Sequence, residues 1–247
     1  MSDDVGHPAG FHGKLLARGD FVTRRLTRRF LDVWDVWLQT AIGDSKQVMG
    51  DAWLEAYLNS PIWRFAISAG IVDETAMAGV LMPSVDRVGR YFPMTIVGAL
   101  PDCRDLTALP ITAAAWFEAA EAVARTGLEE RLDFDRFDAD VSNLGAPACN
   151  GGDTLALSTP QGLRLVLPAV DAVAEGYRGL VRHYLEATLP GHSLWWTAGS
   201  EDIPPAMLIC RGLPAPNGFP AFLDRRWDAW GWGHEPAADL AAELEIA

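Results

Sequence analysis

The stretch MAGVLMPSVDRVGRYFPMTIVGAL, Met77 to Leu100, places two apolar runs on either side of a loop rich in charged residues. Each run is short, borders a proline and contains β-branched residues, which is typical of buried strands. The two runs are therefore predicted to be neighbouring strands, and Ser84 to Tyr91 is predicted to connect them at one end of a sheet. This strand pair is the centre of the predicted fold.

Similar short apolar runs elsewhere predict more strands, and apolar residues spaced three and four apart predict helices. The other strands are expected at Ile62–Ser68, Thr154–Thr159, Leu163–Pro168, Ser193–Gly199 and Pro205–Gly212. Helices are expected from Val22 to Gly43, Ser45 to Asn59, Pro110 to Thr126 and Pro168 to Pro190, with Asp20 as the cap of the first. Leu128–Asp140 is expected to be a short helix or an irregular cover.

The alternation of strands with long helices, without a low-complexity linker, predicts the α/β class. We expect one domain over residues 1–235, built on a mixed sheet that is covered on both faces, followed by an acidic tail over residues 236–247.

Composition excludes several functions and compartments. The net charge of −13 disfavours nucleic acid and anionic membranes as partners. No apolar stretch is long enough to cross a bilayer, so no membrane insertion is expected. The first residues are acidic where a secretory signal would be basic and then apolar, and the three cysteines are odd in number and form no CxxC motif. These features predict a cytoplasmic protein with reduced thiols.

The basic residues gather near the start of the chain. Residues 1–29 hold six Lys or Arg against three acids, and Arg24, Arg25, Arg28 and Arg29 fall at helical spacing opposite the apolar face of the first predicted helix. Two interpretations stay open for this set, a solvated helix face and a binding patch for a protein.

Recognised catalytic motifs are missing. The chain has no phosphate-binding GxxxxGK[ST], no GxGxxG after a strand, no HExxH and no GxSxG. Cys149 to Thr154, CNGGDT, is interpreted as a turn, and the pair His183 and Glu186 as a surface pair, because a second such pair is not present for a metal site. We therefore predict no catalytic residue, no metal and no cofactor.

The loop from Ser84 to Tyr91 allows two compatible interpretations. Asp86 is expected to pair with Arg87 or Arg90 and to fix the loop, with Gly89 permitting a tight turn. The arginine forks also suit recognition of carboxylate or phosphate groups. Asp86 is the one acid–base candidate of the loop, so a hydrolase or small-ligand enzyme with an Asp/Arg pocket is the alternative function. A purely structural component is a third hypothesis.

The adjacent Trp195 and Trp196 are expected to point to opposite faces of a strand. If only one face of the sheet is covered there, one indole is exposed and becomes a candidate interface anchor.

Several motifs together resemble the TagF (ImpM) family of type VI secretion accessory proteins. They are FHGKLLARGDFVTRRL (Phe11–Leu26), WDVWLQ (Trp34–Gln39), YLNSPIWRFAIS (Tyr57–Ser68), GVLMPSVDRVGRYFPMTIV (Gly79–Val97) and SLWWTAG (Ser193–Gly199). The resemblance extends from about Phe11 to beyond Trp196, and PSVDRVGRYFP is the most specific of the motifs.

This resemblance implies a three-layer α/β/α sandwich and a protein that regulates type VI secretion after translation, restraining assembly or firing through protein contacts. The implied partner is the forkhead-associated scaffold protein of that system. Some relatives are fused to a serine/threonine phosphatase domain. The sequence contains no such segment, so we expect any phosphatase action to need a separate chain. The partner-binding candidates are Ser84, Asp86, Arg87, Arg90, Tyr91, Arg24, Arg25 and Trp195.

Overall fold

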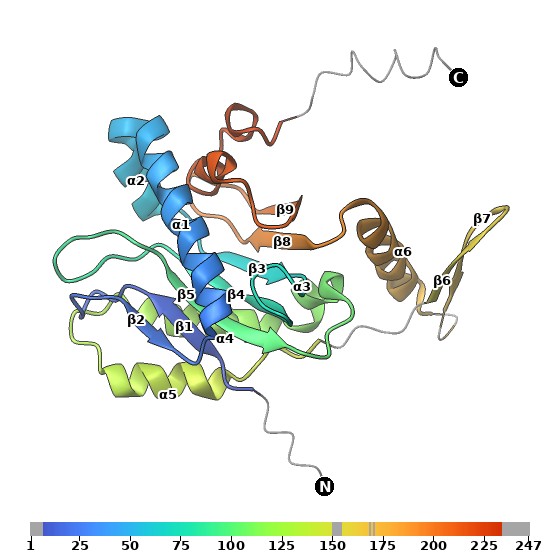
Figure 1. Ribbon diagram of the computed structural model, residues 1–247, viewed down its shortest axis with the longest axis horizontal. Coiled ribbons are helices and arrows are strands. Elements are labelled where there is room, and N and C mark those ends of the chain that lie inside the picture. Colours follow the sequence, from blue (N-terminus) through green and yellow to red (C-terminus); the bar gives the residue numbers. More distant parts are fainter. Residues whose placement is uncertain (1–6, 150–154, 168, 170, 234–247) are drawn as a thin grey trace, which may run out of the picture.

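The computed structural model describes residues 7–149, 155–167, 169 and 171–233. Its centre is a seven-stranded sheet with the order β2-β1-β5-β4-β3-β8-β9 (Figure 1). The strands are β1 (Gly10–Gly13), β2 (Val22–Arg24), β3 (Trp63–Ile67), β4 (Ala76–Met82), β5 (Met94–Leu100), β8 (His192–Thr197) and β9 (Ala206–Arg211). The predicted strand pair is confirmed, since β4 and β5 pair from Ala76 opposite Leu100 to Met82 opposite Met94.

Every described strand pair is antiparallel, so the expectation of a mixed sheet is wrong. For β3, β4 and β5 the cause is the length of the connections. Strands β3, β4 and β5 follow one another through loops, 68–75 and 83–93, that hold no crossover helix, and such loops return the chain in the opposite direction.

Helices cover both faces of the sheet, which confirms the α/β sandwich. One layer holds α1 (Arg28–Met49), α2 (Trp53–Asn59) and the short turns η1 (Gly50–Ala52), η3 (Pro216–Phe222) and η4 (Trp227–Trp230). The other holds α4 (Ala114–Thr126) and α5 (Phe134–Leu144), preceded by η2 (Leu106–Ala108) and α3 (Leu109–Thr112). Residues along β4 alternate between the two layers, with Val80 packed on the α4 side and Leu81 on the α1 side.

The first helix begins later than predicted. Residues 22–24 form β2, which pairs with β1, and Arg25 then adopts a positive φ of 56°. Thr27 caps the helix by accepting a hydrogen bond from the amide of Phe30, so Asp20 is not the cap. The helix also continues through Gly43 and ends at Met49, with Gly50 as its C-cap, whose φ of 56° suits glycine.

A small unit lies at one edge of the molecule (Figure 1). It comprises two of the predicted strands, β6 (Leu155–Thr159) and β7 (Gly162–Val166), which pair as a hairpin, and the helix α6 (Val173–Thr188). The positions Val173, Tyr177 and Tyr184 of α6 are exposed, although apolar residues at three- and four-residue spacing usually form the buried face of a helix. The predicted helix start at Pro168 and the tail over residues 236–247 lie outside the described residues.

The cysteines also differ from the prediction. Cys103, after β5, and Cys149, after α5, form a disulfide with their Cα atoms 5.3 Å apart, so two of the three thiols are not reduced in this structure. The disulfide could not be predicted from the sequence, because the two cysteines are 46 residues apart and composition does not show which distant loops meet. Cys210 is free and half-buried, and burial raises the pKa of its thiol.

Candidate functional site

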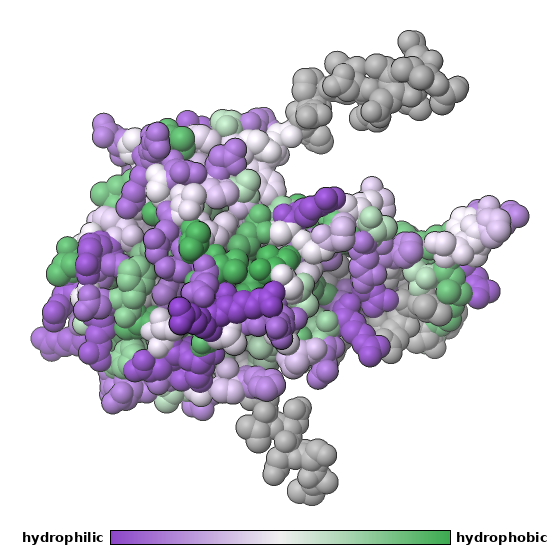
Figure 2. Space-filling view, viewed as in Figure 1, coloured by the Kyte–Doolittle hydropathy of each residue, from purple (hydrophilic) through white to green (hydrophobic). Residues whose placement is uncertain are grey.

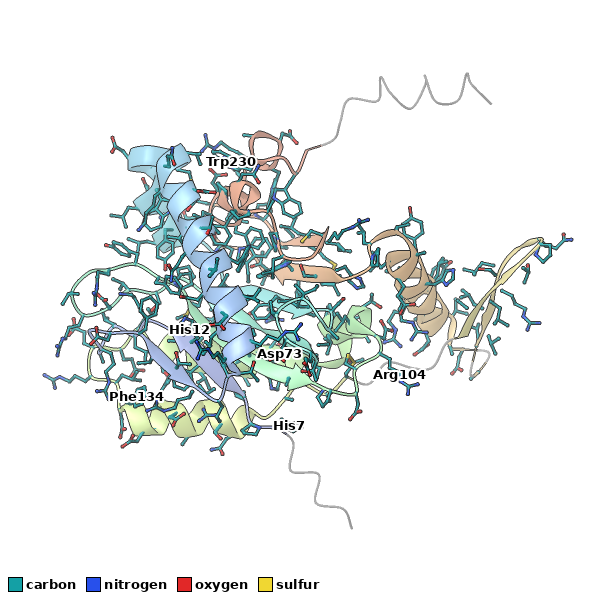
Figure 3. The ribbon with its side chains drawn as sticks, viewed as in Figure 1. His7, His12, Asp73, Arg104, Phe134 and Trp230 are labelled. Atoms are coloured by element: carbon teal, nitrogen blue, oxygen red, sulfur yellow. A yellow bond between two sulfur atoms is a disulfide. The ribbon has the colours of Figure 1, made fainter. Side chains whose placement is uncertain are left out.

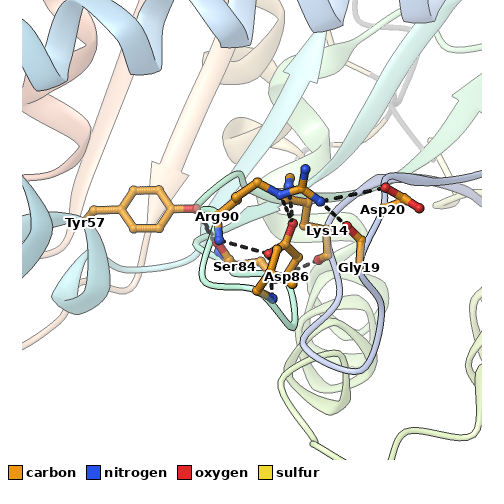
Figure 4. A network of polar contacts seen from close by, with 8 residues as sticks. Lys14, Gly19, Asp20, Tyr57, Ser84, Asp86 and Arg90 are labelled. Carbon is orange, nitrogen blue, oxygen red and sulfur yellow. Dashed lines mark hydrogen bonds and ion pairs between the residues drawn. The ribbon is translucent and has the colours of Figure 1, made fainter.

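The loop between β4 and β5 is fixed at its base by a buried carboxylate. Asp86 is 1% exposed and binds the ammonium of Lys14, which follows β1 and is 4% exposed. The Nε of Arg90 donates to the same carboxylate oxygen at 2.7 Å. We call these three residues the latch, because they tie the β4–β5 loop to the β1–β2 loop (Figure 4).

The second oxygen of Asp86 fixes the shape of the loop. It accepts hydrogen bonds from the amides of Val88 at 3.0 Å and Arg90 at 2.9 Å. Burial alone would raise the pKa of Asp86, but the hydrogen bonds from Lys14, Arg90 and Val88 outweigh it and lower the pKa well below its usual range. Gly89 has a φ of 84°, as its predicted role in a tight turn requires.

Ser84 and Tyr57 close the inner side of the loop. The hydroxyl of Ser84 donates to the carbonyl of Lys14 at 2.7 Å, and that of Tyr57 donates to the carbonyl of Ser84 at 2.8 Å (Figure 4). Burial raises the pKa of Tyr57, so its hydroxyl stays protonated. Ser84 and Asp86, both predicted as partner-binding residues, are therefore buried within the fold of this protein.

The outer rim of the loop has the opposite character. Arg87, Val88 and Gly89 are exposed, and 57% of the Arg90 side chain is exposed although its Nε is bound to Asp86. Tyr91 is half-buried and its ring packs edge-on against those of Trp53 and Tyr57. The rim, unlike the base, presents charged groups to solvent.

A groove of about 560 Å³ opens beside this rim. Its walls are the β1–β2 loop, the β4–β5 loop and the first turn of α5, which meet at the left of the molecule in Figure 1. The guanidinium groups of Arg18 and Arg24 lie 4.7 and 5.1 Å from the ring centroid of Phe134, and Arg87 also lines the groove. We call this the arginine groove and define it by Arg18, Arg24, Arg87 and Phe134, the last of which Figure 3 labels on α5.

Arg24 and Arg25 lie elsewhere than predicted. Arg24 is the last residue of β2, Arg25 follows it, and both precede α1. The four arginines therefore do not share one helix face, as their spacing had predicted. Arg25 donates to the carbonyl of Ala9 at 2.7 Å and to the carboxylate of Asp138 at 2.5 Å, which makes it a link between β1 and α5. Arg24 borders the arginine groove.

Trp195 is fully buried and is not available as a surface anchor. It lies among Trp34, Trp37 and Phe65 on the α1 side, while Trp196 packs on Phe117 of α4. The two indoles do point to opposite faces, but both faces are covered, so the condition for an exposed indole is not met.

The chemistry expected for a hydrolase is not assembled at Asp86. Its side chain is 0% exposed, and its oxygens accept four hydrogen bonds from three residues, Lys14, Val88 and Arg90. Its lowered pKa also disfavours proton uptake near neutral pH. Among the described residues, no three His, Cys, Asp or Glu side chains gather where they would hold a metal ion. Over the same residues, the structure contains no helix that is both long and apolar enough to span a bilayer.

Lys14, Arg18, Tyr57 and Phe134 were missed as site residues. Lys14 and Arg18 belong to the motif at Phe11–Leu26, but the motif does not reveal that Lys14 meets Asp86, 72 positions later. Phe134 lies in Leu128–Asp140, which was predicted as a short helix or an irregular cover, and no sequence signal relates Phe134 to the arginines.

The comparisons with known proteins place the chain in a family. A family model described as the TagF N-terminal domain, type VI secretion system-associated, matches residues 10–144. These residues include the latch and the whole arginine groove. The chain belongs to this family of type VI secretion-associated proteins.

One solved structure is similar over nearly the whole chain. It is the crystal structure of PA0076 from Pseudomonas aeruginosa PAO1, with 37% sequence identity and a TM-score of 0.77. The likeness covers 92% of this chain and 96% of that chain, and so extends past the matched N-terminal domain. Among curated proteins, no match is found.

Proposed function

We propose that this protein is a non-enzymatic accessory protein of type VI secretion, which acts in the cytoplasm after translation and represses assembly or firing of the apparatus through protein contacts. The observation that carries the docking role is the division of the β4–β5 loop. Its base is locked by buried ionic contacts and its rim holds Arg87 outward. A rigid loop with exposed arginines loses little conformational freedom on binding, which suits recognition of a protein partner.

The partner proposed is the forkhead-associated scaffold protein of the secretion system, and a separate serine/threonine phosphatase is a second partner. Membership in the TagF family supports the link to type VI secretion, and both partners are carried over from the resemblance. On this chain the exposed candidates for the contact are Arg87, the outer part of Arg90, and Arg24.

The alternative, a hydrolase with Asp86 as its base, is supported less well. A general base must reach its substrate and accept a proton, and Asp86 is buried, fully hydrogen-bonded and lowered in pKa.

Arg87→Ala tests the docking role. Within the described chain the guanidinium of Arg87 has no hydrogen bond or ion pair, so its removal leaves the latch intact. We expect the variant to keep its circular dichroism spectrum and to capture at least about tenfold less scaffold protein in a pull-down, because a charged hydrogen bond contributes about 1.5–3 kcal/mol. Overproduction of the variant should also repress effector secretion less than overproduction of the natural protein.

The matched control is Arg28→Ala, which removes an arginine that is 93% exposed from the start of α1. Equal capture of the scaffold by the natural protein and by Arg87→Ala would contradict docking through this rim. Arg90→Ala is a poor substitute, since it also removes a bond to Asp86.

A further inference from the structure

The arginine groove has properties of a binding site for an anion. Three guanidinium groups line it, in a chain whose net charge is −13. That of Arg24 lies 3.7 Å from the carboxylate of Asp138, which offsets the charge of Arg24. In Figure 2 the same left side of the molecule is mostly hydrophilic. A local basic groove on an acidic protein selects for anionic groups on a binding partner.

Two of the three guanidinium groups have unused donors. Among the residues that the structure describes, neither Arg18 nor Arg87 has a hydrogen bond or ion pair from its side chain. Arg18 rests on the face of Phe134, a contact that orients the guanidinium group without using its N–H groups. Each planar group therefore keeps a fork of donors that fits a carboxylate or a phosphate.

The backbone holds the two arginines close together. The amide of Arg87 donates to the carbonyl of Arg18 at 2.9 Å, which joins the two loops directly. The guanidinium of Arg87 also lies near Gly19, the residue that follows Arg18. A Cβ atom on Gly19 would be 3.8 Å from Nη2 of Arg87. Because Arg90 also donates to the carbonyl of Gly19, the latch fixes the wall on which both free groups stand (Figure 4).

Two acidic side chains also line the groove and limit its charge. The carboxylate of Asp20 lies 3.7 Å from the guanidinium of Arg90, and this cation offsets the charge of Asp20. Asp135, at the start of α5, has no basic partner among the described residues. An anion in the groove is therefore repelled by Asp135, and this repulsion provides a second, opposite test.

We propose that the arginine groove binds an oxyanion carried by an acidic segment of a protein, held between the guanidinium groups of Arg18 and Arg87. The oxyanion is a side-chain carboxylate or a phosphate ester on that segment. This ligand class rests on the proposed docking function, since it names what the groove recognises on the partner.

The test uses the full chain and three fluorescent peptides of the same length. One is rich in Asp and Glu, the second has one phosphothreonine in the same sequence, and the third replaces each acid by its amide. We expect both anionic peptides to bind, the amide peptide not to bind, and the affinity to fall as salt rises. Tighter binding of the phosphorylated peptide identifies phosphate as the source, and equal binding identifies carboxylate.

Variants make the result specific to the groove. Arg18→Ala with Arg87→Ala should weaken binding of the anionic peptides by at least about tenfold. Asp135→Asn should tighten it, because it removes a like charge beside the anion. The control pair, Arg28→Ala with Arg29→Ala, removes the same charge from α1 and should change the affinity little. No binding of either anionic peptide, or equal binding by the groove variant, would overturn the inference.

The scaffold pull-down, repeated with the same variants, separates the two proposals. If the groove variant loses scaffold capture but the natural protein binds neither anionic peptide, the oxyanion ligand is overturned and the docking function stays in place. Peptide binding that depends on Arg18 and Arg87, with scaffold capture unchanged, overturns docking through this face and leaves the anion site in place.

Discussion

At the scale of single residues, Asp86 and Arg87 show how neighbours in the sequence divide between structure and function. Asp86 faces inward and meets the ammonium of Lys14 in a site that excludes solvent, while Arg87 faces outward. A buried ion pair contributes little net stability as a pair, but removal of one partner leaves an uncompensated charge. A substitution at Asp86 should therefore lower the stability of the fold, whereas a substitution at Arg87 should not.

Asp86→Asn should lower the free energy of unfolding by about 3–5 kcal/mol at pH 7, because the ammonium of Lys14 stays buried without its counter-ion. Asp20→Asn is the control, since the side chain of Asp20 is 99% exposed, and it should change stability by less than about 0.5 kcal/mol. Urea unfolding of both variants measures the two effects.

Urea unfolding of the natural protein and of Asp86→Asn at several pH values tests the charge state of Asp86. The pKa of Asp86 is lowered in the folded state, so its stabilisation is complete above the unfolded-state pKa of about 3.9 and is lost as pH falls toward the folded-state value. The difference in stability between the natural protein and Asp86→Asn should therefore narrow below about pH 4. A difference that stays constant from pH 7 to pH 3 would show that the carboxylate is not held in its charged form.

At the scale of elements, the disulfide ties the helical layer to the sheet. Cys103 and Cys149 close a loop of 46 residues that contains α3, α4 and α5. A crosslink over a loop of this length restricts the unfolded chain and is associated with a stabilisation of about 4 kcal/mol.

Reduction with dithiothreitol should accordingly lower the melting temperature by about 8–16 °C, from the usual shift per kcal/mol for a chain of this size. The double variant Cys103→Ser with Cys149→Ser should melt at the lower temperature with or without reductant, and Cys210→Ser should respond to reductant as the natural protein does. A count of three reactive thiols in the unreduced, denatured protein would contradict the pairing.

At the scale of the whole molecule, the candidate site is formed where three distant segments meet. The β1–β2 loop, the β4–β5 loop and the start of α5 come together only because β1 pairs with β5 and α5 packs beneath that edge. The aromatic core on the α1 side, centred on Trp195, holds the other part of the sandwich together.

Trp195→Ala should therefore act through stability of the fold and not through a lost surface contact. We expect a loss of about 3–5 kcal/mol in urea unfolding, as for other buried aromatic residues. Tyr177→Ala on α6, whose side chain is 67% exposed, is the matched aromatic control and should change stability by less than about 0.5 kcal/mol. Equal stability of Trp195→Ala and the natural protein would refute the buried position.

Local patterns were sufficient for many elements of this protein, although they missed β2 and placed the ends of the first helix wrongly. The β4–β5 pair, the hairpin β6–β7 and most helices follow from apolar periodicity and from proline and glycine at the ends, since these signals act over a few residues. An ion pair of Asp86 with Arg87 or Arg90 was also predicted, because these residues are close in the sequence, and the structure forms it with Arg90.

Long-range contacts determine the features of the fold and of the candidate site that local patterns did not predict. The antiparallel order of the sheet, the covered faces around Trp195, the disulfide and the meeting of Lys14 with Asp86 all depend on which distant segments pack together. The arginine groove has the same origin, since Arg18, Arg87 and Phe134 come from three separate parts of the chain. Such contacts arise when apolar faces are buried against one another, and a local pattern reports that a face exists without reporting what covers it.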